Sequence, residues 1–151
     1  MKSFADTSFL CALYRAQSNS ANADRLFKTS ALPVFVSSLV LYEFRQGLRL
    51  EAFRFRQHRA HGFSEKEIPN MLMYLDANMR DGAIEVEYAD WPEVYDLAER
   101  LSAQYTISNG HRAMDIIHVA TALHVKAAQF LTFDENQALL AKKAGLKINL
   151  K

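Results

Sequence analysis

Short apolar segments alternate with longer helical patterns along the whole chain, and this alternation constrains the fold more than any other feature. The strand candidates are the segments 3–5, 33–38, 83–89, 129–133 and 146–150. Helical patterns begin near Ser8, Ala23, Leu39, Glu65, Trp91, Arg112 and Glu135. Such alternation favours an α/β fold whose mostly parallel sheet is covered by helices on both faces. The segment 83–89 alternates in polarity, so we expect it nearer an edge of the sheet.

The chain is expected to form one domain. Its 151 residues contain no repeat and no linker rich in glycine, serine or proline, so we predict a single domain over residues 1–151. Hydrophobic residues make up 50% of the sequence, which is enough for a core. The net charge of +1 excludes a polycation, so any nucleic-acid binding requires a local basic patch.

The single cysteine and the hydropathy pattern bear on the compartment. Cys11 cannot form an internal disulfide, which fits a reducing cytoplasm, and its apolar surroundings favour a core residue over a nucleophile. No segment has the length and apolarity of a signal peptide or of a membrane span. We therefore expect a soluble cytoplasmic protein without a membrane partner.

Two acidic residues follow strand candidates directly. Asp6 comes after the segment 3–5, and Asp134 comes after the segment 129–133. Ligands of open parallel sheets gather beyond the carboxyl ends of the strands, so both acids are expected to face the same end of the molecule. Each has a structural alternative, because an aspartate there also caps the next helix or opens a turn.

Two further acids lie inside apolar helical patterns. Asp115 is in the middle of the segment 112–125, and Glu43 is surrounded by Leu39–Phe44. Burying an unpaired carboxylate costs several kcal/mol, so each acid needs a hydrogen-bonding partner, a proton or a cation. Pairing with an arginine is the structural alternative for both. Gly47, one turn after Glu43, either leaves room beside that carboxylate or breaks the helix.

The four acids, in this order and in these contexts, resemble the PIN-domain family. The matching segments are FADTSFL, SSLVLYEFRQGL, RAMDIIHVATAL and FLTFDENQALLAKKAGLKI, and the resemblance spans residues 3–148. Within the family the chain is most similar to the VapC-type toxins of VapBC toxin–antitoxin pairs. The resemblance implies a three-layer α/β/α sandwich around a parallel sheet. It assigns metal-binding and catalytic roles to Asp6, Glu43, Asp115 and Asp134.

The resemblance also implies an activity, which is Mg²⁺- or Mn²⁺-dependent cleavage of single-stranded or loop RNA to a 5′-phosphate and a 3′-hydroxyl. It further implies a cognate antitoxin and a homodimer. The apolar residues of 91–101 are either the surface of that dimer or part of the core.

Electrostatics independently favours a bound divalent cation among clustered acids. Two carboxylates about 5 Å apart repel by roughly 3 kcal/mol at an effective dielectric of 20, and oxygen ligands suit Mg²⁺ or Mn²⁺.

Several polar residues near the acids are candidates for supporting roles. Ser8 and Thr7 either cap a helix or hydrogen-bond near the metal, and Thr132 is expected on the same side of its strand as Asp134. Arg112 either pairs with Asp115 or meets a phosphate of the substrate. His118 shares a helical stripe with Asp115 and His111, a spacing compatible with zinc, but a buried hydrogen-bonded neighbour is the favoured interpretation.

The residues 45–59 hold the one concentration of arginines in the sequence. On a continuous helix, Arg54 alone falls on the side of Glu43, and the other arginines form a face for solvent or a protein partner rather than for RNA. Arg54 is therefore a candidate substrate contact, and a helix break at Gly47 would reopen the question for the others.

Three competing functions remain open at this stage. Asp6 could accept a phosphoryl group, although the D-x-D pattern of one such class of enzymes is missing. The chain could be a non-catalytic PIN-like interaction module. It could also be a PIN nuclease of RNA processing without an antitoxin, and a small reading frame immediately upstream would favour the toxin instead.

Overall fold

The structure, a computed structural model, describes residues 1–31 and 33–149 and contains a five-stranded sheet. The strands are β1 (Ser3–Ala5), β2 (Val34–Val36), β3 (Ile84–Val86), β4 (Gln129–Leu131) and β5 (Lys147–Ile148). Their order is β3-β2-β1-β4-β5, and every neighbouring pair is parallel. The parallel α/β sheet and the edge position of β3 are as predicted. Leu150, the end of the last predicted strand, lies outside the described residues.

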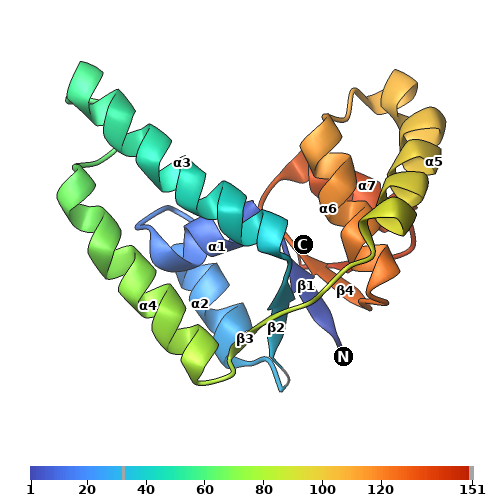
Figure 1. The fold of residues 1–151 in the computed structure, drawn as a ribbon, viewed down its shortest axis with the longest axis horizontal. Helices are drawn as coiled ribbons and strands as arrows, with labels where there is room; N and C mark the ends of the chain where they lie inside the picture. Colours follow the sequence, from blue (N-terminus) through green and yellow to red (C-terminus); the bar gives the residue numbers. More distant parts are fainter. Residues whose placement is uncertain (32, 150–151) are drawn as a thin grey trace.

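Helices cover both faces of this sheet. They are α1 (Thr7–Tyr14), α2 (Ser20–Lys28), α3 (Ser38–Gln57), the short 3₁₀ helix η1 (Glu65–Glu67), α4 (Ile68–Arg80), α5 (Trp91–Asn109), α6 (Ala113–His124) and α7 (Glu135–Lys143). Figure 1 shows α1 to α4 on one side of the sheet and α5 to α7 on the other. The three-layer α/β/α sandwich is therefore confirmed. None of the helices in the described part of the chain combines the length and apolarity that crossing a membrane requires.

The start of α3 shows how the local sequence sets a helix boundary. Ser37 follows β2, and its hydroxyl accepts a hydrogen bond from the backbone N–H of Val40 at 3.2 Å. This cap satisfies one of the donors that every helix start leaves unpaired. The helix then runs unbroken through Gly47, so the alternative of a break there is wrong. A Cβ at Gly47 would have no neighbour within 4 Å, so the glycine faces open space.

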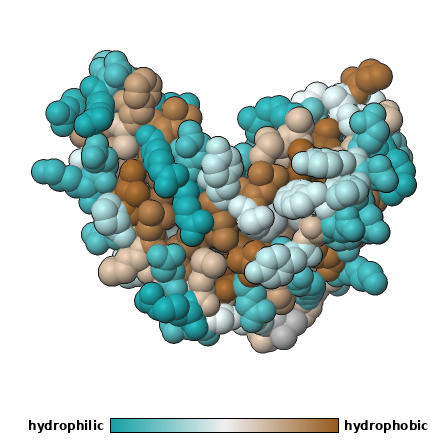
Figure 2. Space-filling model, in the orientation of Figure 1, coloured by the Kyte–Doolittle hydropathy of each residue, from teal (hydrophilic) through white to brown (hydrophobic). Residues whose placement is uncertain are grey.

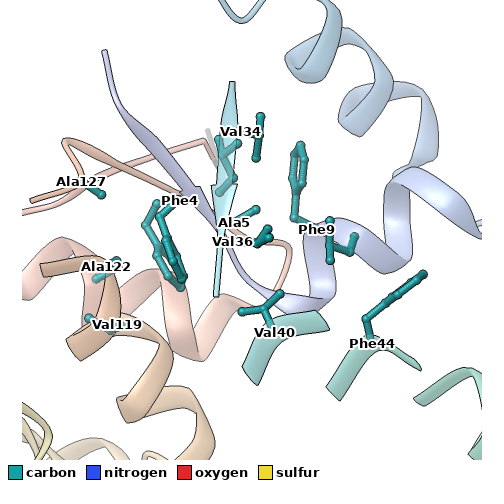
Figure 3. Close-up of a cluster of buried hydrophobic side chains, with 14 of the residues drawn as sticks. Phe4, Ala5, Phe9, Val34, Val36, Val40, Phe44, Val119, Ala122 and Ala127 are labelled. Atoms are coloured by element: carbon teal, nitrogen blue, oxygen red, sulfur yellow. The ribbon is translucent and has the colours of Figure 1, made fainter. Parts of the chain in front are cut away.

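The core is divided by the sheet into two parts. Phe4 and Phe130 occupy paired positions of β1 and β4, and their rings stack at 6.3 Å. Figure 3 shows Phe4 on the side of Val119 and Ala122, while Phe9 and Phe44 lie across the sheet. Burial of one such side chain stabilises the fold by roughly 1.5–3 kcal/mol. The large residues therefore fix the helices of each layer against the sheet.

The strand order creates one position where a ligand site is expected. From β1 the chain adds β2 and β3 on one side, and it later adds β4 and β5 on the other. Connections that leave a sheet in opposite directions open a crevice beyond the carboxyl ends of the strands at that point. Here the point lies between β1 and β4. In the view of Figure 2 the molecule is hollowed between the two groups of helices.

Candidate functional site

Asp6 lies at this switch point, immediately after β1. Its Oδ1 caps α1 by accepting hydrogen bonds from the N–H of Phe9 at 2.9 Å and the hydroxyl of Ser8 at 2.7 Å. Its Oδ2 accepts a hydrogen bond from the Thr132 hydroxyl at 2.7 Å. The side chain is fully buried, and this burial raises its pKa from 3.8 to about 6 although the hydrogen bonds oppose the shift. Within the described residues, these bonding partners are all uncharged.

Thr132 and Ser8 connect the end of β1 to the end of β4. Ala5 pairs with Leu131, which places Asp6 and Thr132 side by side one residue later. The Thr132 hydroxyl also accepts a hydrogen bond from the N–H of Asp134 at 3.0 Å, and Ser8 accepts one from the N–H of Phe133 at 2.8 Å. Both hydroxyls thus hold the backbone on which Asp134 is mounted.

Asp134 and Asp115 share one arginine. Asp134 caps α7, because its Oδ1 accepts a hydrogen bond from the N–H of Gln137 at 2.9 Å. Arg112 precedes α6 and donates from Nε to Asp115 Oδ2 at 2.8 Å, and from Nη2 to Asp115 Oδ1 at 3.3 Å. The same Nη2 donates to Asp134 Oδ2 at 3.3 Å. The pairing of Arg112 with Asp115, one of the two predicted alternatives, is present, and the contact with Asp134 was not predicted.

Glu43 is held by a different pair of residues. The Thr7 hydroxyl donates a hydrogen bond to Glu43 Oε2, and Nε2 of His118 lies 2.7 Å from the same oxygen. The hydrogen bond with His118 lowers the pKa of Glu43, and the bond from Thr7 acts in the same direction. His118 is buried, with 1% of its surface exposed. It is thus the hydrogen-bonded, buried neighbour that the sequence favoured, and its partner is Glu43 rather than Asp115.

Arg54, the predicted substrate contact, lies far along α3 from Glu43. It lies in the last turn of α3, where it forms an ion pair with Glu51. Eleven residues of helix separate it from Glu43, or about 16 Å at a rise of 1.5 Å per residue. The helix is continuous through Arg45, Arg49 and Arg56, but it ends at Gln57, so the prediction that Arg59 shares their helical face is wrong.

One contact at this site has no signal in the sequence. Asn149 accepts a hydrogen bond from the N–H of Thr132 through its Oδ1 at 2.8 Å. The bond depends on β5 pairing with β4, which places the chain end beside the switch point. A lone asparagine after the last strand candidate gives no indication of this partner. Asn149 therefore helps to fix the loop that carries Thr132 and Asp134.

The oxygen atoms of these side chains are of the kind that coordinates a hard divalent cation. Carboxylate and hydroxyl oxygens are the ligands that Mg²⁺ and Mn²⁺ prefer, and the fully buried carboxyl of Asp6 has no charged hydrogen-bond partner in the described chain. Helix starts add positive potential, since Asp6 and Asp134 cap helices and Asp115 lies in the first turn of α6. As the described side chains stand, no three acidic, histidine or cysteine residues form a ready-made metal cluster.

Comparison with known proteins identifies a family. The family model described as PIN domain matches residues 3–143. No curated protein sequence is significantly similar to the chain.

Several solved structures share the fold. The structure of VapC20 from Mycobacterium tuberculosis, a Sarcin-Ricin loop cleaving toxin, has a TM-score of 0.61 at 20% identity and covers 96% of each chain. FitAcB from Neisseria gonorrhoeae has a TM-score of 0.63 at 18% identity, over 97% of this chain and 95% of that one. VapBC2 from Rickettsia felis, bound to a DNA fragment from their promoter, has a TM-score of 0.64 at 16% identity, over 99% and 98%.

Proposed function

This chain belongs to the PIN-domain family, and from that premise we propose that it is a metal-dependent endoribonuclease. The observation that carries the proposal is the buried carboxyl of Asp6, which lies at the sheet's switch point with uncharged partners. Thr132 links this carboxyl to Asp134, and Arg112 links Asp134 to Asp115. Three hydrogen bonds offset part of the cost of burying this carboxyl, and a proton or a divalent cation would offset the rest.

The four acids share one role in this proposal, and neighbouring side chains hold them in place. Asp6, Glu43, Asp115 and Asp134 would supply the oxygen ligands of Mg²⁺ or Mn²⁺. A bound ion of this kind would offset charge on the phosphodiester and lower the pKa of water. Ser8 and Thr132 fix the carboxylate of Asp6 from both oxygens, and Thr7 and His118 orient Glu43.

The proposed reaction is hydrolysis of a phosphodiester bond in single-stranded or loop RNA. A water oxygen forms a bond to phosphorus while the bond from phosphorus to the 3′ oxygen breaks. The attacking water gives up one proton and the 3′ oxygen takes one up, which leaves a 5′-phosphate and a 3′-hydroxyl. The lowered pKa of Glu43 keeps its carboxylate ionised and able to accept a hydrogen bond from the attacking water.

Cleavage of a single-stranded RNA in Mg²⁺ or Mn²⁺ tests the proposal. Loss of even an outer partner of a metal site typically reduces activity about 10–100-fold, so Asp6→Asn and Asp115→Asn should each cut at least about 100-fold more slowly than wild type. Asp76→Asn is the matched control, since Asp76 is an exposed residue of α4. Circular dichroism verifies that the variants fold. Equal cleavage by all four proteins would remove the assignment.

We further propose that the chain acts in the cytoplasm as the toxin of a toxin–antitoxin pair, with a cognate antitoxin as its partner. The support is the likeness of its fold to VapC20, which is called a toxin, and to VapBC2. A PIN nuclease of RNA processing without an antitoxin is the second candidate.

A homodimer is also proposed, with its contact at the starts of α3 and α5. A depression of about 330 Å³ there is lined by Ser38, Leu39, Tyr42, Trp91 and Tyr95. Tyr42 is 62% exposed and Tyr95 is 56% exposed, and the rings of Trp91 and Tyr95 lie 6.2 Å apart. Exposed aromatic residues are enriched at protein interfaces, where burying them contributes strongly to binding.

A further inference from the structure

Arg112 is an exposed cation clamped onto two acids from different elements. Its side chain is 73% exposed, whereas that of Asp115 is 6% exposed and that of Asp134 is 27% exposed. Two of its nitrogens reach both oxygens of Asp115, and one of these nitrogens also reaches Asp134. The guanidinium therefore lies on the solvent side of the two carboxylates and contacts both.

The charges around Arg112 do not balance. One guanidinium faces two carboxylates, those of Asp115 and Asp134. The group as a whole remains negative, so it attracts a further cation although an arginine is already bound.

A divalent cation and this guanidinium compete for the same oxygens. Coordination by Asp115 and Asp134 would bring two positive groups into close contact, and the protein side chain is the one that can move. Arg112 precedes the first residue of α6, and most of its side chain is in solvent, so turning away breaks few other contacts. A released guanidinium at this place has the planar, two-pronged geometry that binds phosphate oxygens.

From this geometry we infer that Arg112 is the counter-ion of Asp115 and Asp134 when no metal is bound. When a divalent cation binds these acids, the Arg112 side chain turns away and binds a phosphate of the RNA. The inference rests on the proposed function and deepens it. Arg112 thereby lowers the affinity for the free metal and raises the affinity for RNA once the metal is bound.

Calorimetric titration with Mn²⁺ in the absence of RNA tests the first part. Energetically coupled binding events typically alter each other's affinity about 5–150-fold, so Arg112→Gln should bind Mn²⁺ at least about fivefold more tightly than wild type. Arg112→Lys keeps the charge but loses the two-pronged contact, and its affinity should lie between the two. Arg80→Gln is the control of equal charge, since this exposed residue ends α4 before the start of the edge strand β3, whereas Arg112 contacts Asp134 after the end of β4.

Fluorescence anisotropy with a labelled single-stranded RNA in Mn²⁺ tests the second part. The RNA carries non-hydrolysable linkages, so that wild type, which keeps all four proposed metal ligands, is compared directly with Arg112→Gln. Loss of one phosphate contact should weaken RNA binding. It should also reduce the slope of log affinity against log salt concentration by about one.

The outcomes separate the inference from the proposed function. If wild type binds Mn²⁺ and cuts RNA but Arg112→Gln binds Mn²⁺ no more tightly, the inference alone is overturned. Unchanged RNA affinity and salt dependence of Arg112→Gln overturn it as well. If wild type neither binds Mn²⁺ nor cuts RNA, the proposed function itself fails.

Discussion

At the scale of single residues, Asp6 has two roles that the sequence presented as alternatives. Its Oδ1 caps α1, as the structural interpretation predicted. Its Oδ2 faces Thr132 across the switch point, where the candidate site lies. Capping uses one carboxylate oxygen and leaves the other for the site, so the two interpretations do not exclude each other. The same holds for Asp134, whose Oδ1 caps α7 while its Oδ2 meets Arg112.

The raised pKa of Asp6 predicts a pH dependence of stability in metal-free buffer. A carboxyl whose pKa is higher in the folded protein than in the unfolded chain binds its proton more tightly when folded, so its contribution to stability falls as the pH rises between the two values. For Asp6 these values are 3.8 and about 6. At about 1.4 kcal/mol per unit, the loss should approach about 3 kcal/mol.

Urea unfolding in EDTA measures this contribution. The unfolding free energy of wild type minus that of Asp6→Asn should decrease between about pH 4 and pH 7, since the asparagine does not ionise. Subtracting the variant removes the contributions of the other titrating groups. A difference that stays constant over this range would contradict the assignment of the shift to Asp6.

At the scale of elements, three of the four acids lie at helix starts, and two of these helices directly follow a strand. α1 begins directly after Asp6, α7 begins directly after Asp134, and Asp115 lies in the first turn of α6. Helix starts carry partial positive charge, so this arrangement stabilises carboxylates that would otherwise repel one another. α3 differs, because Glu43 lies more than one turn from its capped end. The position of Glu43 therefore depends on the cap at Ser37 and on His118.

Removing the cap of α3 should destabilise the protein by a predictable amount. Ser37→Ala deletes the hydroxyl that accepts from the N–H of Val40, and loss of such a cap costs about 1 kcal/mol. Urea unfolding at a fixed pH measures the change. Ser108→Ala is the control, since Ser108 is an exposed residue near the end of α5 and should alter stability by less than about 0.5 kcal/mol. Equal effects of the two variants would refute the capping role.

At the scale of the whole molecule, the sequence predicted the elements better than their contacts. Each helix begins within three residues of its predicted start, because hydropathy periodicity and capping residues are local signals. Asp6 and Asp134 were expected at one end because parallel strands share a direction. The central position of β1, the bridge from Arg112 to Asp134 and the bond to Asn149 were not predictable, since each depends on which distant strands pair.

The proposed dimer is tested by its molar mass in solution. Tyr95→Glu places a charge in the aromatic surface between α3 and α5 and should convert a dimeric wild type into a monomer, as measured by sedimentation velocity. Tyr74→Glu alters a tyrosine of similar exposure, 59% against 56%, on α4 and should leave the dimer intact. A monomeric wild type, or a dimeric Tyr95→Glu variant, would exclude this interface.

The central place of β1 also bears on the order of events during synthesis. β1 is made before β4 and receives this second neighbour only when residues 129–131 have been made. At about 5–20 residues per second, Asp6 waits several seconds for the strand that carries Thr132 and Asp134 to it. A nascent chain that ends before residue 129 therefore cannot form the hydrogen bonds that join Asp6 to Thr132 and Thr132 to Asp134.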